Sequence, residues 1–286
     1  MKSAFLIMAH NNFDMLKLLI CSLDYKDNDI FVHIDKKCGN INYSEFESLT
    51  KISKTICLRV RENVVWGNVS QIAAEFRLFE AAFYNSGGYD YYHLISGVDF
   101  PLRSNKEISD FLELYKGKEF LGLVKSEELI KPRLACYHLF TGRDLLGKIN
   151  RHLFIPMQKL FHIHYKNDIS NYRMGPNWCS ISCNLVEALL MDKKDILKRY
   201  HFSFCCDEVF LQTFVYEHEN FLKNVFDMSN QYRSCMRYID WKRGNPYTFT
   251  MKDLDELSKA DGLFVRKVTK EVMVCLIKAR KINAKN

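Results

Sequence analysis

Hydrophobic residues in the first half of the chain follow two alternating spacings. Residues 4–9 form a continuous apolar run that polar residues end, which is typical of a strand buried on both faces. Residues 16–23 then place leucine and isoleucine at the i, i+3, i+4, i+7 positions of an amphipathic helix. The pattern therefore predicts a buried strand followed by a helix.

The same alternation continues towards residue 124. Further strands are predicted at 30–34, 55–60, 91–95 and 119–124. Helices are predicted at 44–53, from Asn68 until Gly87, and from Ser104, with Asn68 and Ser104 as N-caps. Such βαβ alternation predicts an α/β fold with a mostly parallel central sheet flanked by helices.

The carboxyl ends of the predicted strands carry polar residues. In parallel α/β sheets, ligands bind beyond these ends. The segments concerned are 9–11 (AHN), 33–35 (HID) and 96–99 (SGVD), and we expect them to share one rim. The segment 96–99 indicates either a pocket loop with one carboxylate or an ordinary turn in which Asp99 bonds its own backbone.

The second half of the chain loses this regular rhythm. Residues 125–170 are rich in Lys, Arg and His, and they are predicted to be a basic, irregular subregion rather than a second domain. Regular structure is expected to resume at Trp178, with a capped helix near Asp207. Residues 268–286 form a basic C-terminal tail, so we expect a single domain over 1–286.

Composition and charge narrow the classes of function. With 48% hydrophobic and 26% charged residues, the 286-residue chain has the composition of a globular protein and not of a disordered one. Its net charge of +7 and pI of about 8.8 border on the range of nucleic-acid binders. The same net charge and pI are equally compatible with a pocket for a small anion or with attraction to an anionic membrane. Ten scattered cysteines without a CxxC pair favour a reducing cytosol.

Common catalytic and metal-binding motifs are missing from the sequence. It contains no Gly-rich phosphate loop, no HExxH and no GxSxG motif. Two Asp-x-Asp triplets occur at 27–29 and 253–255. The first precedes a strand and the second begins a helix-like stretch, whereas the metal-binding triplet of nucleotide-sugar transferases follows a strand. No metal site is therefore expected.

A series of short segments carries a family likeness. They are 4–11 (AFLIMAHN), 32–37 (VHIDKK), 65–70 (VWGNVS), 89–104 (YDYYHLISGVDFPLRS), 175–182 (GPNWCSIS), 206–213 (CDEVFLQT), 237–241 (RYIDW) and 263–267 (LFVRK). In this order they resemble the core-2/I-branching β-1,6-N-acetylglucosaminyltransferase family, which includes the peptide O-xylosyltransferases. The short chain looks like a bacterial member of that family.

The resemblance implies a GT-A-like fold and an inverting transfer from a UDP-sugar to a hydroxyl of a glycan acceptor. It implies no metal and no cofactor besides the UDP-sugar co-substrate. It favours GlcNAc as the sugar and assembly of a bacterial surface polysaccharide as the role. Two alternatives stay open: another donor sugar, such as xylose or a different hexose, and an inactive protein that only binds a glycan or a nucleotide. Nucleic acid is not an expected partner, because no binding motif accompanies the basic residues.

By the same resemblance, Glu208 is the general base that accepts the proton of the acceptor hydroxyl. Asp207 would cap the following helix, and Glu208 would lie in its first turn, where the positive helix end keeps a carboxylate ionised. Desolvation by Cys205 and Cys206 would offset the resulting loss of basicity. The alternative is that both acids simply favour a helix N-terminus.

A departing UDP requires fixed positive charge when no metal is present. The resemblance assigns this role to Lys267, with Arg266 beside it. A second cation is expected upstream, where Arg243 and Arg237 are the candidates. The alternative is a solvated run of charges.

The remaining candidates are binding residues. The donor nucleotide and sugar are expected to contact His10, Asp35, Trp66, Ser96, Gly97 and Asp99. The acceptor is expected to contact Trp178, Trp241, Glu127, Glu128, Lys131 and Arg133. For Trp66, the alternative is a core aromatic side chain.

The expected location is the cytoplasm, at the inner face of the cell membrane, where lipid-linked oligosaccharide acceptors reside. The tail at 268–286 mixes apolar and basic residues. It is therefore either a helix that rests on an anionic membrane or a plain solvated helix.

Overall fold

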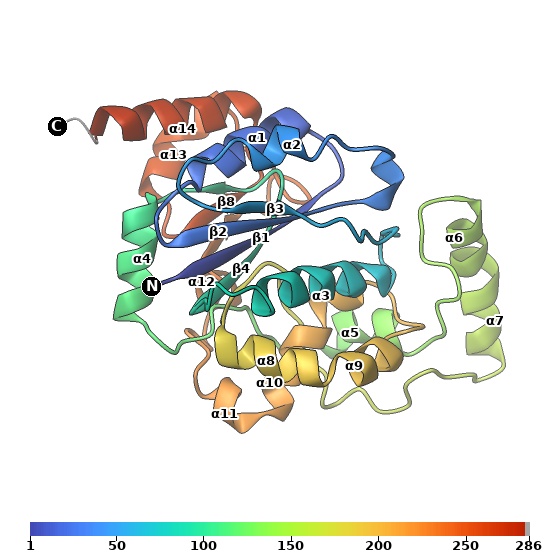
Figure 1. Cartoon of the computed structure of the whole chain (residues 1–286). Coiled ribbons are helices and arrows are strands. Elements are labelled where there is room, and N and C mark those ends of the chain that lie inside the picture. Colours follow the sequence, from blue (N-terminus) through green and yellow to red (C-terminus); the bar gives the residue numbers. More distant parts are fainter. Residues whose placement is uncertain (284–286) are drawn as a thin grey trace.

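A five-stranded sheet forms the centre of the computed structural model, which describes residues 1–283, with side chains up to residue 280 (Figure 1). Its strand order is β3–β2–β1–β4–β6. The strands are β1 (Ser3–Ala9), β2 (Asn28–Ile34), β3 (Thr55–Cys57), β4 (Tyr91–Ser96) and β6 (Ser180–Ser182). All neighbouring strands are parallel except β6, which pairs antiparallel with β4. The predicted α/β fold with a mostly parallel central sheet is confirmed.

Helices cover both faces of this sheet. They are α1 (Phe13–Ser22), α2 (Ser44–Glu47), α3 (Ser70–Phe83), α4 (Asn105–Leu114), α5 (Glu127–Leu134), α6 (Leu145–Ile149), α7 (Ile155–Leu160), α8 (Cys183–Met191), α9 (Lys193–Arg199), α10 (Phe210–Glu217), α11 (Glu219–Leu222), α12 (Gln231–Ser234), α13 (Leu254–Lys259) and α14 (Lys270–Asn283). Figure 1 shows α1 and α14 over one face, and α3 and α8 over the other. Leu6 of β1 enters the core under α3, and Ile7 enters the core under α1. Burial on both faces explains why β1 is a continuous apolar run.

A smaller three-stranded sheet of order β5–β8–β7 lies beside the first. Its strands are β5 (Phe100–Pro101), β7 (Arg237–Ile239) and β8 (Phe264–Arg266). β8 is parallel to β7 and antiparallel to β5. Because β5 follows β4 after a short loop, the end of β8 comes to lie beside the end of β4.

Arg237 joins the two sheets. Its side chain is 2% exposed, and its guanidinium lies 4.7 Å from the centre of the Phe264 ring. It donates hydrogen bonds to the carbonyl oxygens of Leu94, Cys179 and Cys235 and to the hydroxyl of Ser180. Burial lowers the pKa of Arg237 from 12.5, but these acceptors replace the water that the charge has lost. The predicted diphosphate contact of Arg237 is therefore wrong, because its charge is used inside the core.

The predicted strand at 119–124 forms only isolated bridges. The bridges join Glu119 to Val225, Phe120 to Ser180, and Val124 to Met174. The edge of β4 is already occupied by β6, so this segment meets a different partner at each position and no continuous ladder forms.

Two predicted elements are shorter than expected, whereas the predicted cap at Ser104 is confirmed. The helix expected at 44–53 ends at Glu47, because the backbone N–H groups of residues 51–53 donate to the carboxylate of Asp24. The strand expected at 55–60 ends at Cys57. Ser104 caps α4 and forms a capping box with Glu107.

The predicted irregular subregion at 125–170 is largely helical. It contains α5 and a continuous helical run from 145 to 160, in which a π-helical segment (Asn150–Phe154) joins α6 to α7. The prediction of irregular structure is wrong because many apolar residues of this run face solvent. They therefore do not show the spacing of a core-facing helix.

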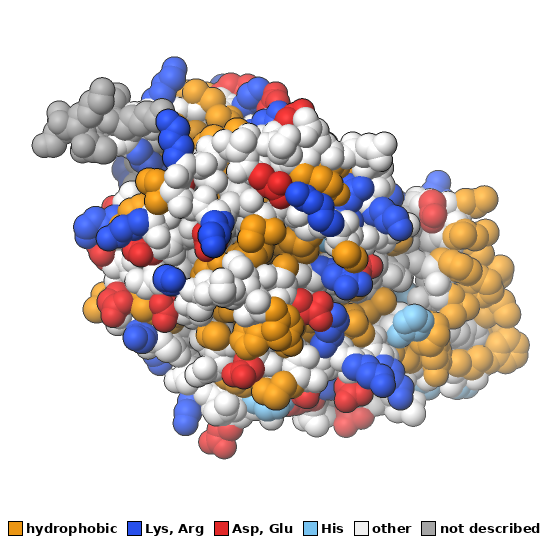
Figure 2. Space-filling model, in the orientation of Figure 1, with side chains coloured by type: hydrophobic (Ala, Val, Ile, Leu, Met, Phe, Trp, Pro, Cys, Tyr) orange, Lys and Arg blue, Asp and Glu red, His pale blue; other side chains and the backbone are white. Residues whose placement is uncertain are grey.

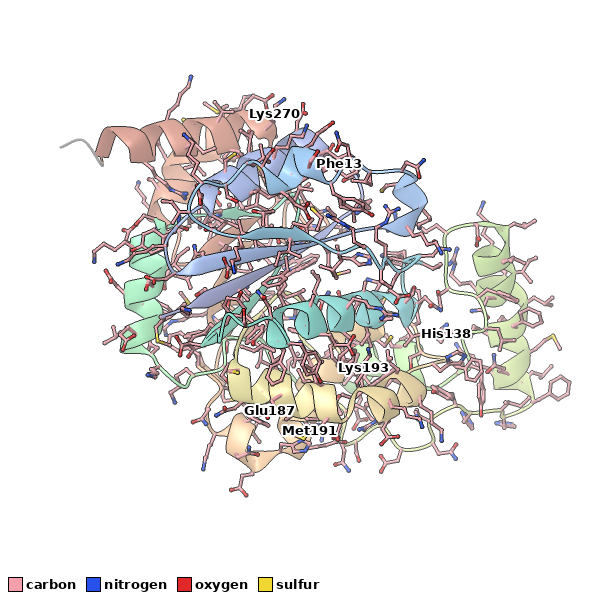
Figure 3. All side chains as sticks on the ribbon, in the orientation of Figure 1. Phe13, His138, Glu187, Met191, Lys193 and Lys270 are labelled. Atoms are coloured by element: carbon pink, nitrogen blue, oxygen red, sulfur yellow. The ribbon has the colours of Figure 1, made fainter. Side chains whose placement is uncertain are left out.

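The basic C-terminal tail forms α14, which packs on α1. Val272 and Met273 are buried in the core, and Lys270, labelled in Figure 3, forms an ion pair of 2.8 Å with Asp14. The apolar side of this helix is part of the core, so the expectation that it rests on a membrane is wrong. Residues 284–286, the end of the predicted tail, lie outside the described residues.

Replacing Arg237 by methionine should destabilise the fold. Methionine leaves the oxygen acceptors in the core without their donor, so we expect the free energy of unfolding to fall by about 3 kcal/mol. Urea titration followed by circular dichroism measures this change. Arg59→Met, which removes the exposed ion pair with Glu47, should cost less than about 1 kcal/mol. Equal losses in both variants would contradict the linking role of Arg237.

Candidate active site

The ends of β1, β2 and β4 meet at one edge of the central sheet, as the sequence predicts. The strand registers place the last residues of the three strands side by side. Beyond the strands, the N–H of Asp35 donates to the carbonyl of Ala9 and the N–H of Gly97 to that of Met8, each at 2.9 Å. His10, Asp35 and Gly97 therefore lie along one rim.

Asp35 organises the first part of this rim and is largely buried. Its Oδ1 accepts a hydrogen bond of 2.9 Å from the N–H of Lys37, and its Oδ2 lies 3.6 Å from Lys37 Nζ. His10 is exposed nearby. A pocket of about 230 Å³ lies next to this turn and is lined by Lys36, Arg59, Val60 and Arg61. Its three cationic side chains suit an anionic ligand.

The predicted pocket loop at 96–99 acts as a clamp for Arg266. Asp99 is 1% exposed, and its Oδ2 accepts a hydrogen bond of 2.8 Å from the N–H of Ser96, as in an ordinary turn. Its Oδ1 pairs with Arg266 Nη1 at 2.7 Å, and the Ser96 hydroxyl contacts the same nitrogen. The guanidinium carbon lies 4.3 Å from the centre of the Trp178 ring. Ser96, Asp99 and Trp178 thus hold Arg266 in place.

Lys267 follows β8 and lies next to Arg266. Within residues 1–283, its ammonium group forms no ion pair with a carboxylate. Partial burial and the like charges of Arg266 and Arg143 lower the pKa of Lys267 from 10.5, against the opposing effect of Asp99. The guanidinium of Arg143 lies 4.5 Å from the centre of the Trp66 ring. Arg266 and Arg143 are thus both close enough to Lys267 to act on its charge, and within residues 1–283 neither Lys267 nor Arg143 forms an ion pair with a carboxylate.

Arg243, the other predicted second cation, is not free to neutralise a diphosphate. Its guanidinium pairs with Asp240, with Asp253 at 3.0 Å and with Glu256 at 2.7 Å. Carboxylates from three positions neutralise its charge, so the expected role of Arg243 is wrong. Arg143 and Arg266 accompany Lys267 instead.

Glu208 lies in a 3₁₀ turn (Cys206–Glu208) ahead of α10, with Val209 at the N-cap of that helix. The predicted capping by Asp207 and the first-turn position of Glu208 are therefore wrong, because the Asp207 side chain turns inwards. Glu208 Oε2 accepts a hydrogen bond of 2.5 Å from Arg133 Nη2. In the described part of the chain, Oε1 accepts no hydrogen bond, so this oxygen is available to a ligand.

The turn that carries Glu208 packs against the loop at 65–70. The N–H of Cys205 donates to the carbonyl of Gly67 at 2.9 Å. Gly67 has a φ of 75°, and a Cβ there would lie 2.5 Å from the Phe204 ring, so only glycine fits. The exposed Trp66 contacts Phe204 edge to face, with ring centres 5.2 Å apart, and the guanidinium of Arg143 lies over its ring. Trp66 is therefore a surface aromatic and not a core residue.

Two buried carboxyl groups lie behind Glu208. Asp207 Oδ2 accepts a hydrogen bond of 2.9 Å from Gln71 Nε2, and burial together with the Glu208 charge raises the pKa of Asp207 to about 7. Burial and the charge of Asp207 raise the pKa of Glu75 well above its usual range, while Asn177 donates to its Oε1 at 3.0 Å. Glu75 and Asp207 are thus buried acids with raised pKa values, and Glu208 is the solvent-accessible member of this group.

Residues 175–178 connect the carboxylate and cation parts of the site. The N–H of Gly175 donates to the Glu208 carbonyl at 3.0 Å, and Trp178 lies against Arg266. A Cβ on Gly175 would lie 2.0 Å from the carbonyl oxygen of Gly122, so the segment needs glycine there. Three residues span at most about 11 Å. This short segment therefore links the Glu208 turn to the Arg266 stack.

The predicted acceptor residues separate into three places. Glu127, Glu128 and Lys131 are exposed on α5, the helix from which Arg133 reaches Glu208. Trp178 lies against Arg266, and Trp241 is exposed in the loop after β7. Within residues 1–283, no hydrogen bond, ion pair or ring contact joins Trp241 to Glu208 or Lys267.

The sequence analysis missed Arg143, Gln71 and Glu75. Arg143 lies in the basic subregion, where its charge is the only local signal. Gln71 and Glu75 are four residues apart on α3 and share one side of it. A polar pair on the otherwise apolar side of a long predicted helix was the signal for them.

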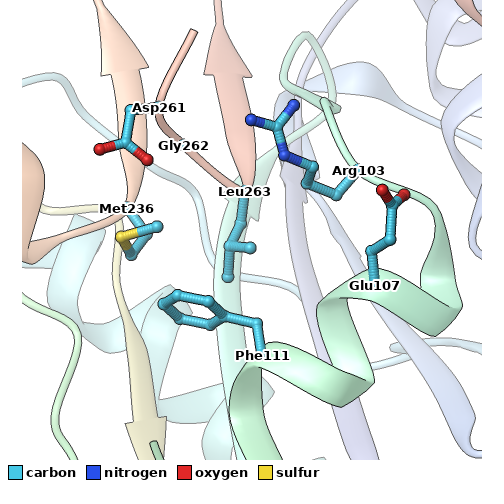
Figure 4. A pocket seen from close by; sticks show the side chains of 7 residues that line it. All are labelled: Arg103, Glu107, Phe111, Met236, Asp261, Gly262 and Leu263. Atoms are coloured by element: carbon cyan, nitrogen blue, oxygen red, sulfur yellow. The ribbon is translucent and has the colours of Figure 1, made fainter. Parts of the chain in front are cut away.

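A different pocket lies away from these groups. It measures about 200 Å³ and is lined by Arg103, Glu107, Phe111, Met236, Asp261, Gly262 and Leu263. Figure 4 shows Arg103 and Glu107 on the α4 side, with Asp261 and Met236 opposite. These residues lie near the start of β8, whereas Lys267 follows its end. Among the described residues, no group of three or more His, Cys, Asp or Glu side chains is arranged to hold a metal ion.

The chain matches a family model over most of its length and individual known enzymes over less than half of it. The model of the Core-2/I-branching enzyme family matches residues 3–261. Mouse N-acetyllactosaminide β-1,6-N-acetylglucosaminyl-transferase is 29% identical over 116 residues, which is 40% of this chain and 29% of the mouse protein. Bovine β-1,3-galactosyl-O-glycosyl-glycoprotein β-1,6-N-acetylglucosaminyltransferase is 24% identical over 131 residues (46% and 31%). Bovine xylosyltransferase 2 is 23% identical over 120 residues (41% and 14%).

The chain spans less than a third of the length of these curated relatives. The solved structure of mouse xyloside xylosyltransferase 1 aligns with 92% of this chain and 97% of its own, at 10% identity. Its TM-score of 0.39 is too low to support an argument about the fold. The family model, in contrast, covers nearly the whole described chain, and on this ground the chain belongs to the Core-2/I-branching enzyme family.

Proposed function

We propose that this protein transfers a sugar from a UDP-sugar to a hydroxyl group of a glycan acceptor, with inversion and without a metal ion. The observation that carries the proposal is a series of contacts at the carboxyl edge of a parallel sheet. The turn before Glu208 packs on the loop of Trp66, Trp66 contacts Arg143, and Arg143 and Arg266 lie near enough to Lys267 to lower its pKa. Glycosyl transfer needs a base on one side of the anomeric carbon and positive charge on the other. The family supports the same chemistry.

Glu208 accepts the proton of the acceptor hydroxyl in this proposal. Arg133 holds Oε2, which leaves Oε1 to take the proton as the hydroxyl oxygen attacks the anomeric carbon. The bond between that carbon and the UDP oxygen breaks on the opposite face, so the configuration inverts. Glu127, Glu128 and Lys131 on α5 border the acceptor side and can bind its other hydroxyl groups.

The departing UDP carries the bonding electron pair, and Lys267 and Arg143 stabilise its charge. Arg266 is already paired with Asp99, so it contributes hydrogen-bond donors and shape more than net charge. His10, Asp35 and Trp66 border the same rim and would bind the nucleoside and sugar. Protein cations can neutralise a diphosphate without a metal when they are held in place, as Arg266 and Arg143 are by ring stacking.

GlcNAc is the proposed donor sugar, and xylose or another hexose is the alternative. Relatives named as GlcNAc transferases and as xylosyltransferases match similar shares of this chain. A cytoplasmic role in building a bacterial surface polysaccharide, on a glycan or lipid-linked acceptor, completes the proposal. An inactive sugar-binding protein is disfavoured because the sequence retains both Glu208 and Lys267 at the positions that match the family.

Glu208→Gln should lower kcat about a thousandfold and leave UDP affinity nearly unchanged. Glutamine keeps the size of the side chain but cannot accept the proton. UDP release measures turnover, and calorimetric titration measures UDP affinity. Glu219→Gln, at an exposed acidic residue in the first turn of α11, is the matched control and should retain full activity. Retained activity in Glu208→Gln would show that another group is the base.

Lys267→Ala should weaken UDP binding about tenfold to a hundredfold, because a hydrogen bond to a charged group is lost. Lys252→Ala, at an exposed lysine, should bind UDP as the unchanged protein does. Equal affinities in the two variants would remove Lys267 from the donor site.

The same titration carries a pH signature. The lowered pKa of Lys267 means that its ammonium loses the proton at a lower pH than an ordinary lysine, whose pKa is 10.5. UDP affinity should therefore fall with rising pH before pH 10.5 is reached, and Lys267→Ala should abolish this fall. A fall that persists in Lys267→Ala would assign the titration to another group.

A panel of UDP-sugars assayed with and without EDTA tests the donor and the metal together. We expect UDP-GlcNAc to give the fastest UDP release, at a rate that EDTA leaves unchanged, because Lys267 and Arg143 supply the charge. A faster rate with UDP-xylose would identify the alternative donor. Strict dependence on Mn²⁺ would contradict the metal-free mechanism.

A further inference from the structure

The helical run at 145–160 turns an apolar surface to solvent. In Figure 1, α6 and α7 stand apart from the sheet, and Figure 2 shows apolar side chains gathered at this end of the molecule. Leu145 is 70% exposed, Leu160 is 72% exposed and Phe161 is 65% exposed. The other exposed apolar residues of the segment are Leu139, Phe140, Leu146, Leu153, Met157 and Ile163. We call these residues the α6–α7 apolar face.

The buried positions of the run are glycine or polar residues. Gly147, Asn150 and Gln158 are buried. The Gln158 side chain accepts a hydrogen bond of 2.7 Å from the N–H of Tyr137 and donates one of 2.9 Å to the Tyr137 carbonyl. A surface helix normally turns its apolar side to the core. Here the hydrogen bonds of Gln158 fix the polar side of the run against the protein, so the apolar side faces solvent. The exposed face is therefore built into the fold.

The charges around this face are positive. The sequence has no Asp or Glu from residue 145 to residue 166. The same stretch contains Lys148, Arg151, Lys159 and Lys166, together with His152, His162 and His164. Asp144 is the carboxylate next to the run, and it caps α6 by accepting a hydrogen bond of 2.9 Å from the N–H of Gly147.

We propose that the α6–α7 apolar face docks on an anionic lipid bilayer. A helix with leucine, methionine and phenylalanine on one side and Lys and Arg beside them has the composition of interfacial membrane helices. On docking, the apolar side chains leave water and the cations meet anionic headgroups. A second copy of this chain fits less well, because it would bring two positive surfaces together.

The docking face begins beside the candidate active site. Arg143, which lies over Trp66, is two residues before α6. His138, labelled in Figure 3, lies on the link between α5 and α6, between the body of the protein and the helical run. A protein docked in this way holds its site near the bilayer surface, where a lipid-linked acceptor presents its sugar. The docking itself does not rest on the proposed chemistry, because it is measured without donor or acceptor.

The proposed membrane contact therefore lies on the α6–α7 apolar face and not on the C-terminal tail, which was one of the two alternatives from the sequence. The apolar residues of α14 belong to the core, whereas those of the α6–α7 apolar face are exposed. No helix within residues 1–283 combines the length and the apolar character that crossing a bilayer requires.

Flotation of the full chain with lipid vesicles tests the proposal. We expect the protein to float with vesicles of phosphatidylcholine and phosphatidylglycerol, and much less with phosphatidylcholine alone. The double variant Leu153→Glu with Leu160→Glu should lower binding at least about tenfold, because two leucines no longer enter the interface. Raised NaCl should also lower binding, because it screens the cations.

The matched control is Leu114→Glu with Met191→Glu, which changes two apolar residues on α4 and α8 that are at least as exposed as Leu153 and Leu160. This control should bind vesicles as the unchanged protein does. Circular dichroism checks that both double variants are folded. Should the α6–α7 variant fail to fold, Lys148→Glu with Lys159→Glu should lower binding to the anionic vesicles through charge alone.

Several outcomes would overturn the proposal. The protein does not float with anionic vesicles, or both double variants lose binding equally. Alternatively, light scattering shows a dimer that Leu153→Glu with Leu160→Glu converts to a monomer, which would assign the face to a second copy of the chain.

Discussion

The pairing of β1 with β2 on one edge and with β4 on the other is the constraint on which the rest of the structure depends. Both faces of β1 are covered, so its side chains are apolar and its polar backbone is satisfied within the sheet. Parallel pairing then brings the ends of the three strands together. The residues at the carboxyl ends of these strands are polar, and His10, Asp35 and Ser96 lie there along one edge of the sheet. The candidate active site exists because these strands end together.

The chemistry at this rim depends on which charges are paired. Arg237 donates its hydrogen bonds to oxygen atoms between the two sheets. Arg243 pairs with three carboxylates, and Arg266 pairs with Asp99. Lys267 and Arg143 remain as positive charge for a ligand. The carboxyl groups also differ, because burial raises the pKa of Glu75 well above its usual range while Glu208 reaches solvent. The excess of seven positive charges therefore says less about function than the position of two of them.

Periodicity predicted the elements that pack on the core and failed where a segment has no regular partner. β1, β4 and the capped start of α4 were predictable, because each obeys a local rule of burial or capping. The segment 119–124 has the composition of a strand but meets three different partners, so it makes only bridges. The run at 145–160 is helical but was not recognised as a helix, because many of its apolar residues point away from the protein and leave no core-facing pattern. At the site, family resemblance located Glu208 and Lys267, and no local pattern identified Arg143.

By itself, the sequence determined the alternation of strands and helices up to β4, the rim at which the polar residues gather, and the family likeness. These features are encoded within short stretches, since burial of a strand or helix leaves a periodic trace. Only the tertiary structure decided which side chains are partners. Arg133 and Glu208 are 75 residues apart, and Asp99 and Arg266 are 167 residues apart. An ion pair or the protonation of a buried acid depends on distances and solvent exclusion between such remote segments, and neither leaves a local pattern in the chain.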